Sequence, residues 1–172
     1  MTGSNDEPVW RTEARWLAAI AGRLADPGFP TGDHAALRRM APDAPSGHAE
    51  IAAERLFGAV NADPDGKDRQ RWLLIVHCLA LARGRHAPDA RAGRLLADMH
   101  YSEERLSRLL SSDFEVVADV LPRLARWLDS KGAAIDWLPL VRLARWTGRS
   151  EDRADRARHG IARDYARAAV RH

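Results

Sequence analysis

The sequence predicts an all-α protein made of two small helical bundles packed end to end. Apolar residues recur three and four positions apart in segment after segment, whereas no run alternates convincingly with the period of two that a strand shows. The stretch RGRHAPDA, residues 83–90, places Gly and Pro between two helical patterns and is the best candidate for a linker. We therefore expect an N-terminal helical lobe over residues 1–86 and a C-terminal helical lobe over residues 87–172.

The first lobe is predicted to hold four helices. The apolar spacing places them over residues 10–24, 32–41, 47–60 and 67–84. The turn at residues 26–28 ends the first helix, Pro42 stops the second, and Ser46 is the expected N-cap of the third. The fourth is apolar on nearly all sides, which is typical of a helix at the centre of a bundle.

The second lobe is predicted to hold the remaining helices. They cover residues 93–99, 102–110, 113–132, 136–146 and the stretch after Ser150, which is the expected N-cap of the last helix. Pro122 lies inside the third of them and is expected to kink or divide it. The fourth has an apolar face that is expected to be buried, and this face consists of Trp137, Leu140, Leu143 and Ala144.

Length, cysteine content and hydropathy narrow the class of protein. A chain of 172 residues is long enough to bury a core without disulfides, and its single cysteine, Cys78, cannot form one within the chain. The longest nearly apolar stretch, residues 72–82, is too short to cross a bilayer, and the first residues lack the pattern of a secretion signal. We therefore expect a cytoplasmic protein that does not enter a membrane.

The sequence carries no motif for catalysis, metal binding or a cofactor. Its seven histidines include no pair four residues apart with a carboxylate between, as a zinc-dependent hydrolase helix requires. DPDGKD, residues 63–68, has glycine at the fourth place instead of the sixth place of a calcium loop, and its Gly-Lys pair lacks the Ser or Thr of a phosphate loop. His77 and Cys78 lie in an apolar run, so they are expected to be core residues. We therefore expect a protein that is not an enzyme and needs no metal or cofactor.

Arginine supplies nearly all of the positive charge. The formal net charge is +3, and all but two of the 27 basic residues are arginines. A guanidinium grips phosphate through two parallel hydrogen bonds, which suits nucleic-acid binding. An arginine-rich composition is also what a GC-rich genome produces, so only the arrangement of the charges separates the two explanations.

Two arginine stripes favour a functional arrangement. The first stripe lies on and just after the helix that begins at residue 136, beside Trp146, and consists of Arg142, Arg145 and Arg149. The second stripe lies on the last helix, next to an apolar face of Ala154, Ala157, Ile161, Tyr165 and Ala168, and consists of Arg153, Arg156, Arg163, Arg167 and Arg171. Each stripe is either a nucleic-acid-binding surface or an ordinary solvated face, and Trp146 either contacts a base or packs against another helix.

Four segments of the chain carry a resemblance to a known family, and they are, in order, GDHAALRRMA, RWLLIVHCLALA, GRLLADMHYSEERLSRLL and LPRLARWLDSKGAAIDWLPLVRLARW. Their order and spacing resemble the small subunit, often called CasB, of the type I-E Cascade CRISPR surveillance complex. The resemblance extends from about Trp10 to Arg149. It is clearest in the Arg38-Arg39 pair, in the GRxLA segment that contains Arg94, and in the Asp-Trp pair at position 136.

The resemblance implies a non-enzymatic, all-helical protein of two bundles that serves in CRISPR antiviral defence. In this family two copies lie head to tail against the other Cascade subunits. They help to hold the guide RNA (crRNA) and the target DNA strand, and they offer the displaced strand a basic surface. Binding without sequence specificity is expected, because base pairing supplies recognition in an RNA-guided complex.

The resemblance also assigns basic positions to nucleic-acid binding. They are Arg38, Arg39, Lys67, Arg69, Arg71, Arg94, Arg123, Arg142 and Arg149, and the first stripe adds Arg145. Pro122 stands where relatives tend to carry a second basic residue, so no contact is carried over to that position.

Two other classes of protein remain open. A helix-turn-helix regulator would also be small, helical and basic, but the helix after the turn at residues 131–132 begins with Asp136, a carboxylate where the DNA backbone would come. A helical adaptor that binds only proteins would tolerate loss of the arginine stripes but not of an apolar surface residue such as Trp146.

Overall fold

The computed structural model of the 172-residue chain describes residues 8–111 and 113–171. Within these residues the chain forms nine α-helices and no strand, which confirms the all-α prediction. The helices are α1 (Val9–Ala25), α2 (Thr31–Arg39), α3 (His48–Ala59), α4 (Gly66–Leu81), α5 (Ala92–Asp98), α6 (Glu103–Leu109), α7 (Phe114–Ser130), α8 (Leu138–Trp146) and α9 (Glu151–Ala169). None of the helices in this described part is long and apolar enough to cross a lipid bilayer.

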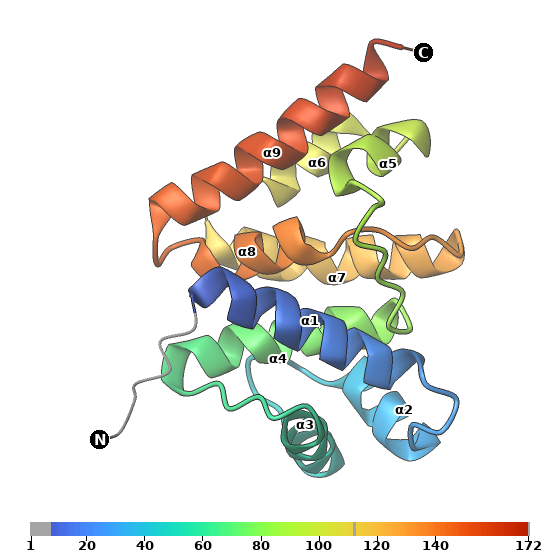
Figure 1. Ribbon diagram of the computed structural model, residues 1–172, viewed down its shortest axis with the longest axis vertical. Coiled ribbons are helices and arrows are strands. Elements are labelled where there is room, and N and C mark those ends of the chain that lie inside the picture. The colour runs from blue at the N-terminus through green and yellow to red at the C-terminus, as the bar shows by residue number, and fades with distance from the viewer. Residues whose placement is uncertain (1–7, 112, 172) are drawn as a thin grey trace.

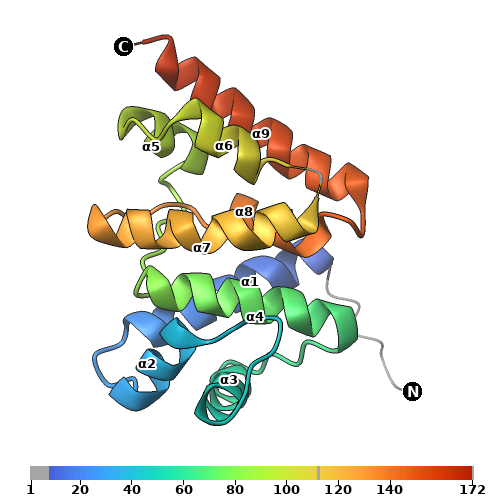
Figure 2. The same cartoon turned by 180° about the vertical axis from the view of Figure 1, so that it is seen from behind.

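The helices are stacked in tiers along the long axis of the molecule (Figure 1). α2 and α3 form one end, α1 and α4 lie next to them, α7 and α8 form the middle, and α5, α6 and α9 form the other end, as the view from behind also shows (Figure 2). α9 packs against both α5 and α8, so its inner face closes this end of the molecule.

α4 is the central helix, as its composition predicts. All residues from Trp72 to Leu81 are buried, because α1, α2, α7 and α8 pack around this helix. The buried apolar residues form one continuous cluster that runs from Leu17 of α1 through α4 and α7 to Ile161 of α9. The expected lobes, residues 1–86 and 87–172, therefore share a core, and their separation into two bundles stays a prediction.

The starts of α3 and α9 test two predicted N-caps. Ser150 is the N-cap of α9, as expected. Ser46 is not the N-cap of α3, because Gly47 takes this place with a φ of 56°. The chain thus turns into α3 through a left-handed backbone conformation, which glycine adopts without a steric penalty.

Pro122 lies in the interior of α7. Of the two effects expected at this residue, a division is not found, since α7 runs as one helix from Phe114 to Ser130, and a kink stays a prediction. Pro122 has no backbone N–H and so removes one helical hydrogen bond. It is buried together with Leu121 and Leu124, and the packing of α7 against the core therefore stabilises the helix despite the lost bond.

The predicted linker, residues 83–90, is held against the segment that leads into α8. The buried Trp137 donates its indole N–H to the carbonyl oxygen of Arg85 at 3.0 Å. The backbone N–H of Asp136 donates to the carbonyl oxygen of Ala90 at 2.7 Å. These contacts fix the start of α8, which carries most of the first stripe.

Candidate nucleic-acid interface

The basic residues predicted to bind nucleic acid do not form one surface. One group of these residues is spread over separate tiers of the molecule (Figure 1), with Arg38 and Arg39 at the end of α2, Arg94 on α5 and Arg123 on α7. A second group lies on two helices that pack together, α4 and α8, or just after α8. It consists of Lys67, Arg69, Arg71, Arg142, Arg145 and Arg149. Only the second group is brought together by the fold.

Surface ion pairs hold some of the scattered arginines. Arg94 Nε lies 3.6 Å from Asp98 Oδ2, and Arg123 Nη2 donates to Asp119 Oδ1 at 2.8 Å. Both arginine side chains are 64% exposed. Exposed pairs one turn apart contribute only about 0.3–0.5 kcal/mol, so these guanidinium groups can exchange their aspartate for a phosphate at little cost.

Lys67 and Arg69 lie near the start of α4. Lys67 is exposed, whereas the side chain of Arg69 is 29% exposed and is paired with two carboxylates of α3. Arg69 Nη2 donates to Glu50 Oε1 at 3.3 Å and also to Glu54 Oε1. Arg69 therefore ties α4 to α3.

Arg71 caps the C-terminal end of α8. Its Nη1 donates to the carbonyl oxygens of Ala144 at 3.0 Å and Thr147 at 2.9 Å, and its guanidinium carbon lies 3.2 Å from the centre of the Phe114 ring. The last carbonyl groups of a helix lack partners within the helix, so this cation satisfies acceptors at the negative end of the α8 dipole. Burial, followed by the charge of Arg149, lowers the pKa of Arg71, which stays protonated at neutral pH. Arg71 thus positions α8.

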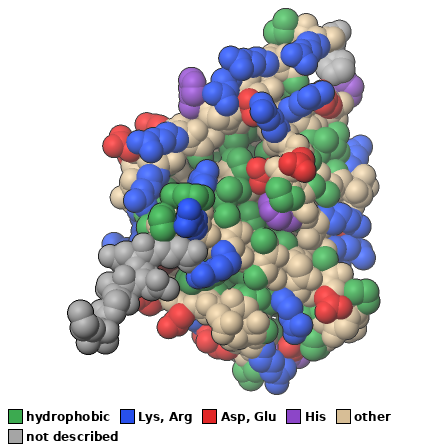
Figure 3. Space-filling model, viewed as in Figure 1, with side chains coloured by type: hydrophobic (Ala, Val, Ile, Leu, Met, Phe, Trp, Pro, Cys, Tyr) green, Lys and Arg blue, Asp and Glu red, His purple; other side chains and the backbone are tan. Residues whose placement is uncertain are grey.

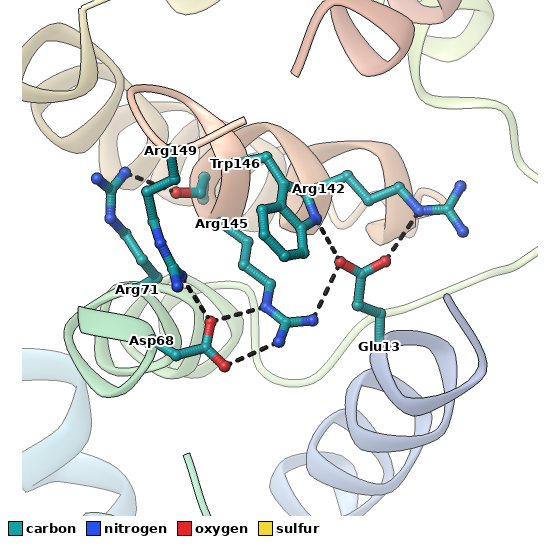
Figure 4. A network of polar contacts seen from close by, with 8 residues as sticks. Glu13, Asp68, Arg71, Arg142, Arg145, Trp146 and Arg149 are labelled. Carbon is teal, nitrogen blue, oxygen red and sulfur yellow. Dashed lines mark hydrogen bonds and ion pairs between the residues drawn. The ribbon is translucent and has the colours of Figure 1, made fainter. Parts of the chain in front are cut away.

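The first stripe faces two acidic residues from other helices (Figure 4). Glu13 of α1 accepts hydrogen bonds from Arg142 Nε and from Arg145 Nη1, each at 3.2 Å. Asp68 of α4 accepts from Arg145 Nε at 2.7 Å, from Arg145 Nη2 at 2.8 Å and from Arg149 Nη1 at 2.9 Å. Arg145 therefore bridges both carboxylates and joins α8 to α1 and α4.

The expectation that the first stripe is an exposed sector is wrong for Arg145. Its side chain is 11% exposed, against 27% for Arg149 and 36% for Arg142. The acidic partners Glu13 and Asp68 lie 132 and 77 residues away from Arg145 in the sequence. The helical period of α8 alone therefore could not show that this side of the helix is covered.

Trp146 lies in the same network and also lines a groove. Its indole N–H donates to Glu13 Oε1 at 2.6 Å. The guanidinium carbons of Arg145, Arg149 and Arg153 lie 4.8, 5.4 and 4.3 Å from the centre of its ring. Cations at these distances are attracted by an aromatic ring. Trp146 therefore both packs within the protein and faces Arg153 of α9.

The groove lies between α8 and α9, on the face that Figure 3 shows. It encloses about 790 Å³ and is closed at its sides by the starts of α1 and α5. Its basic lining residues are Arg91, Arg142, Arg153, Arg156 and Arg163, its aromatic ones are Trp10 and Trp146, and its acidic ones are Glu13, Asp136 and Asp164. Because the arginines outnumber the carboxylates, the lining carries a net positive charge.

The second stripe is exposed along α9, as its periodicity predicts, and basic side chains gather over this helix in Figure 3. Arg163 Nε lies 3.4 Å from Asp164 Oδ1. Arg153, Arg156 and Arg167 form no ion pair with any residue that the structure describes. Guanidinium groups that are spaced along one helix and lack carboxylate partners are suited to binding a phosphate backbone.

Sequence reasoning missed Arg91 and Trp10 as groove residues. Arg91 lies just before α5, outside any helical periodicity; its side chain is 71% exposed, and Nη1 lies 4.0 Å from Asp164 Oδ1. Trp10 is 55% exposed in the first turn of α1, where the sequence pattern assigned it to the apolar spacing of the helix. A tryptophan at the very start of an amphipathic helix is the only sequence signal that could have found it.

The described residues do not bring three or more His, Cys, Asp or Glu side chains together in a way that could hold a metal ion. His77 and Cys78 are buried core residues, as predicted. Burial raises the pKa of the Cys78 thiol, and burial also lowers the pKa of His77, whose Nδ1 lies 2.9 Å from the carbonyl oxygen of Leu37. This pair therefore does not provide a thiolate and a base at a surface.

The fold and the site define a class of protein first: an all-helical, arginine-rich protein with a basic groove. The family described as CRISPR-associated protein Cse2 has a model that matches residues 33–165, from α2 into α9. The chain therefore belongs to this family, the small subunit of the type I-E Cascade CRISPR complex, and the resemblance drawn from the sequence is confirmed. No curated protein and no solved structure matches the chain.

Proposed function

We propose that this Cascade subunit binds the sugar-phosphate backbone of nucleic acid in the groove between α8 and α9. The observation that carries the proposal is that Arg153 and Arg156 line the groove, are exposed and have no ion-pair partner among the described residues. An unpaired guanidinium gains more from a phosphate than a paired one, because it gives up no carboxylate on binding. Arg145 and Arg149, which are paired with Asp68, lack this advantage.

In this role the protein is a non-catalytic surface for guide RNA, target DNA and the displaced strand. Base pairing reads the sequence in an RNA-guided complex, so the arginines need to contact only phosphate and shape. Affinity should therefore fall steeply with salt and depend little on base sequence. Self-association as a head-to-tail pair belongs to the same proposal, since it would place two such grooves along one complex.

The predicted basic residues divide into two roles under this proposal. Exposed or half-exposed residues that contact phosphate are Arg38, Arg39, Lys67, Arg94, Arg123 and Arg142. Residues that chiefly hold the helices in place, through the ion pairs and the helix cap described above, are Arg69, Arg71, Arg145 and Arg149. The first set weakens binding when changed, whereas the second set weakens folding first.

The test compares two double variants of the full chain by the salt dependence of binding to a labelled DNA strand. Arg153→Ala with Arg156→Ala removes the groove cations. Arg105→Ala with Arg108→Ala removes two exposed arginines from α6, the helix that lies in front of α9 in the view of Figure 2. The groove variant should lower the log–log salt slope by roughly 0.7 per lost contact, and the control should leave it nearly unchanged.

An equal decrease of the salt slope in the two variants would mean that overall charge drives binding, and the assignment of binding to the groove would then be wrong. Discrimination among unrelated duplexes by more than about a hundredfold at fixed salt would favour a helix-turn-helix regulator. A chain that enters the complex yet binds no nucleic acid at any salt concentration would favour a purely protein-binding adaptor.

A further inference from the structure

We infer that Trp146 and Arg153 together form a stacking platform for one unpaired base, which makes the groove a site for a single strand rather than a duplex. The inference rests on the proposed function, since it requires a nucleic-acid backbone on the groove arginines. It adds a contact to a base, made by these two side chains, where the proposed function has contacts to the backbone alone.

The indole of Trp146 is fixed before any ligand arrives. Its N–H donates to Glu13 Oε1 at 2.6 Å, and Glu13 is only 2% exposed. The same carboxylate accepts from Arg142 and Arg145, so it cannot turn without breaking those bonds. A ring that is already ordered loses little conformational entropy on binding, and this favours stacking.

Arg153 is the less constrained member of the pair. Three guanidinium groups lie around the Trp146 ring, and those of Arg145 and Arg149 are tied to Asp68. Arg153 is exposed and has no ion-pair partner among the described residues, so it can adjust its plane to an incoming base. Unpaired bases stack both on aromatic rings and on guanidinium planes, so the pair presents a surface that accepts any base.

The groove has room for the rest of a nucleotide. Its volume of about 790 Å³ is within the range of roughly 300–1,000 Å³ that is typical of ligand sites in proteins. Arg156 and Arg163 line the same groove further along α9, where they can reach phosphates that follow the stacked base in one direction.

A duplex cannot use this platform, because its bases are stacked on one another and must be extruded at a cost before they meet a protein side chain. The arginines alone would bind duplex and single strand alike through phosphate. The indole is therefore the feature that separates the two ligands.

The experiment compares three labelled ligands of equal length with the full chain: a thymidine strand, the same strand built with abasic sites, and the corresponding duplex. The thymidine strand should bind at least about fivefold more tightly than the abasic strand, which corresponds to the stacking of one base on an aromatic side chain. Trp146→Leu should abolish this preference, and Trp146→Phe, which keeps an aromatic ring, should retain most of it. Arg105→Ala with Arg108→Ala is the control with altered charge and should fully retain the preference for the thymidine strand over the abasic strand.

The comparison of the thymidine and abasic strands uses the unaltered protein, so it tests whether a base is stacked even if Trp146→Leu fails to fold. Equal affinities together with a steep salt dependence would overturn the stacking platform and leave the proposed function standing. Absence of salt-dependent binding to all three ligands would overturn both. A folded Trp146→Leu protein that keeps the preference, or a preference for the duplex, would also overturn the platform.

Discussion

Arg145 and Asp68 form an ion pair with two parallel hydrogen bonds, Nε to Oδ1 at 2.7 Å and Nη2 to Oδ2 at 2.8 Å. This two-bond geometry is the strongest form of arginine–carboxylate contact. The same guanidinium also donates to Glu13, so one side chain of α8 is bound to both α1 and α4 (Figure 4). An arginine that the helical period assigns to a surface is therefore part of the connection between three helices.

Replacing Arg145 by alanine should lower the free energy of unfolding by about 3 kcal/mol. The change leaves Asp68, 15% exposed, and Glu13, 2% exposed, without a main cationic partner, and a buried carboxylate that loses its partner is costly. Urea unfolding measures the difference. Arg123→Ala is the matched control, because its 64% exposed side chain pairs only across the surface, and it should cost under about 1 kcal/mol. Equal small effects of the two changes would contradict the structural role of Arg145.

The features that the sequence predicted are those that depend on neighbours along the chain. The burial of α4 follows from its composition, and the exposure of the second stripe follows from the position of Ala154, Ala157 and Ile161 on the adjoining face of α9. The burial of α4 and the exposure of the second stripe depend only on which residues share a helix face, so the helical period was sufficient to predict them.

The features that the sequence did not predict depend on contacts between distant segments. The pairing of Arg145 with Glu13 and the capping of α8 by Arg71 each join segments more than 70 residues apart. The groove is likewise assembled from four helices, so Arg91 becomes a lining residue only when α5 packs against α9. No local pattern records such contacts, because they arise from the packing angles of the helices.

Changing Arg71 to methionine should loosen the end of α8. Methionine keeps an unbranched apolar side chain beside Phe114 but loses the hydrogen bonds to the carbonyl oxygens of Ala144 and Thr147. Hydrogen bonds from a charged donor contribute about 1.5–3 kcal/mol, so we expect a loss of about 2 kcal/mol in stability. Hydrogen exchange at the Thr147 amide, which donates to Leu143 at 3.1 Å, should become faster. Lys67→Met, an exposed change on the same helix as Arg71, should alter neither quantity.

Asp33 should make the packing of α2 on α3 depend on pH in the acid range. Its side chain is 5% exposed, and its carboxylate accepts from His48 Nε2 at 2.7 Å and from Arg55 Nη1 at 3.2 Å. Burial raises the pKa of Asp33, but the hydrogen bonds and charges of His48 and Arg55 outweigh this effect and hold the pKa below its ordinary value of 3.8.

Because the pKa of Asp33 is lower in the folded than in the unfolded chain, its contribution to stability is complete above the ordinary value and is lost as the pH falls through the folded value. Urea unfolding at a series of pH values from about 6 down to about 2 measures this loss, which spans the usual range of carboxylate titration. The Asp33→Asn variant should be less stable than the unaltered protein near neutral pH, and its stability should depend less on pH in the acid range. A variant with the same slope as the unaltered protein would assign the acid sensitivity to other carboxylates.

Gly93 sets the closest approach of α5 to α9. A Cβ atom at this position would collide with the carbonyl oxygen of Ile161 and would lie 2.8 Å from the backbone nitrogen of Tyr165. Backbone atoms cannot move aside by changing rotamer, so Gly93→Ala should push the helices apart and cost about 2–3 kcal/mol. Because Gly93 lines the groove and α9 carries Arg153 and Arg156, the same change should also weaken binding of a single DNA strand.

The control for Gly93→Ala is Gly22→Ala in α1. An added Cβ at Gly22 meets no atom within 4 Å, and alanine lowers the conformational entropy of the unfolded chain, so this change should raise stability by about 0.5–1 kcal/mol. Thermal melting of the two variants should therefore shift in opposite directions. A Gly93→Ala protein that melts above the unaltered chain would show that α5 and α9 have room for a side chain between them. The glycine of the GRxLA segment would then have no packing role, and the groove wall would not depend on it.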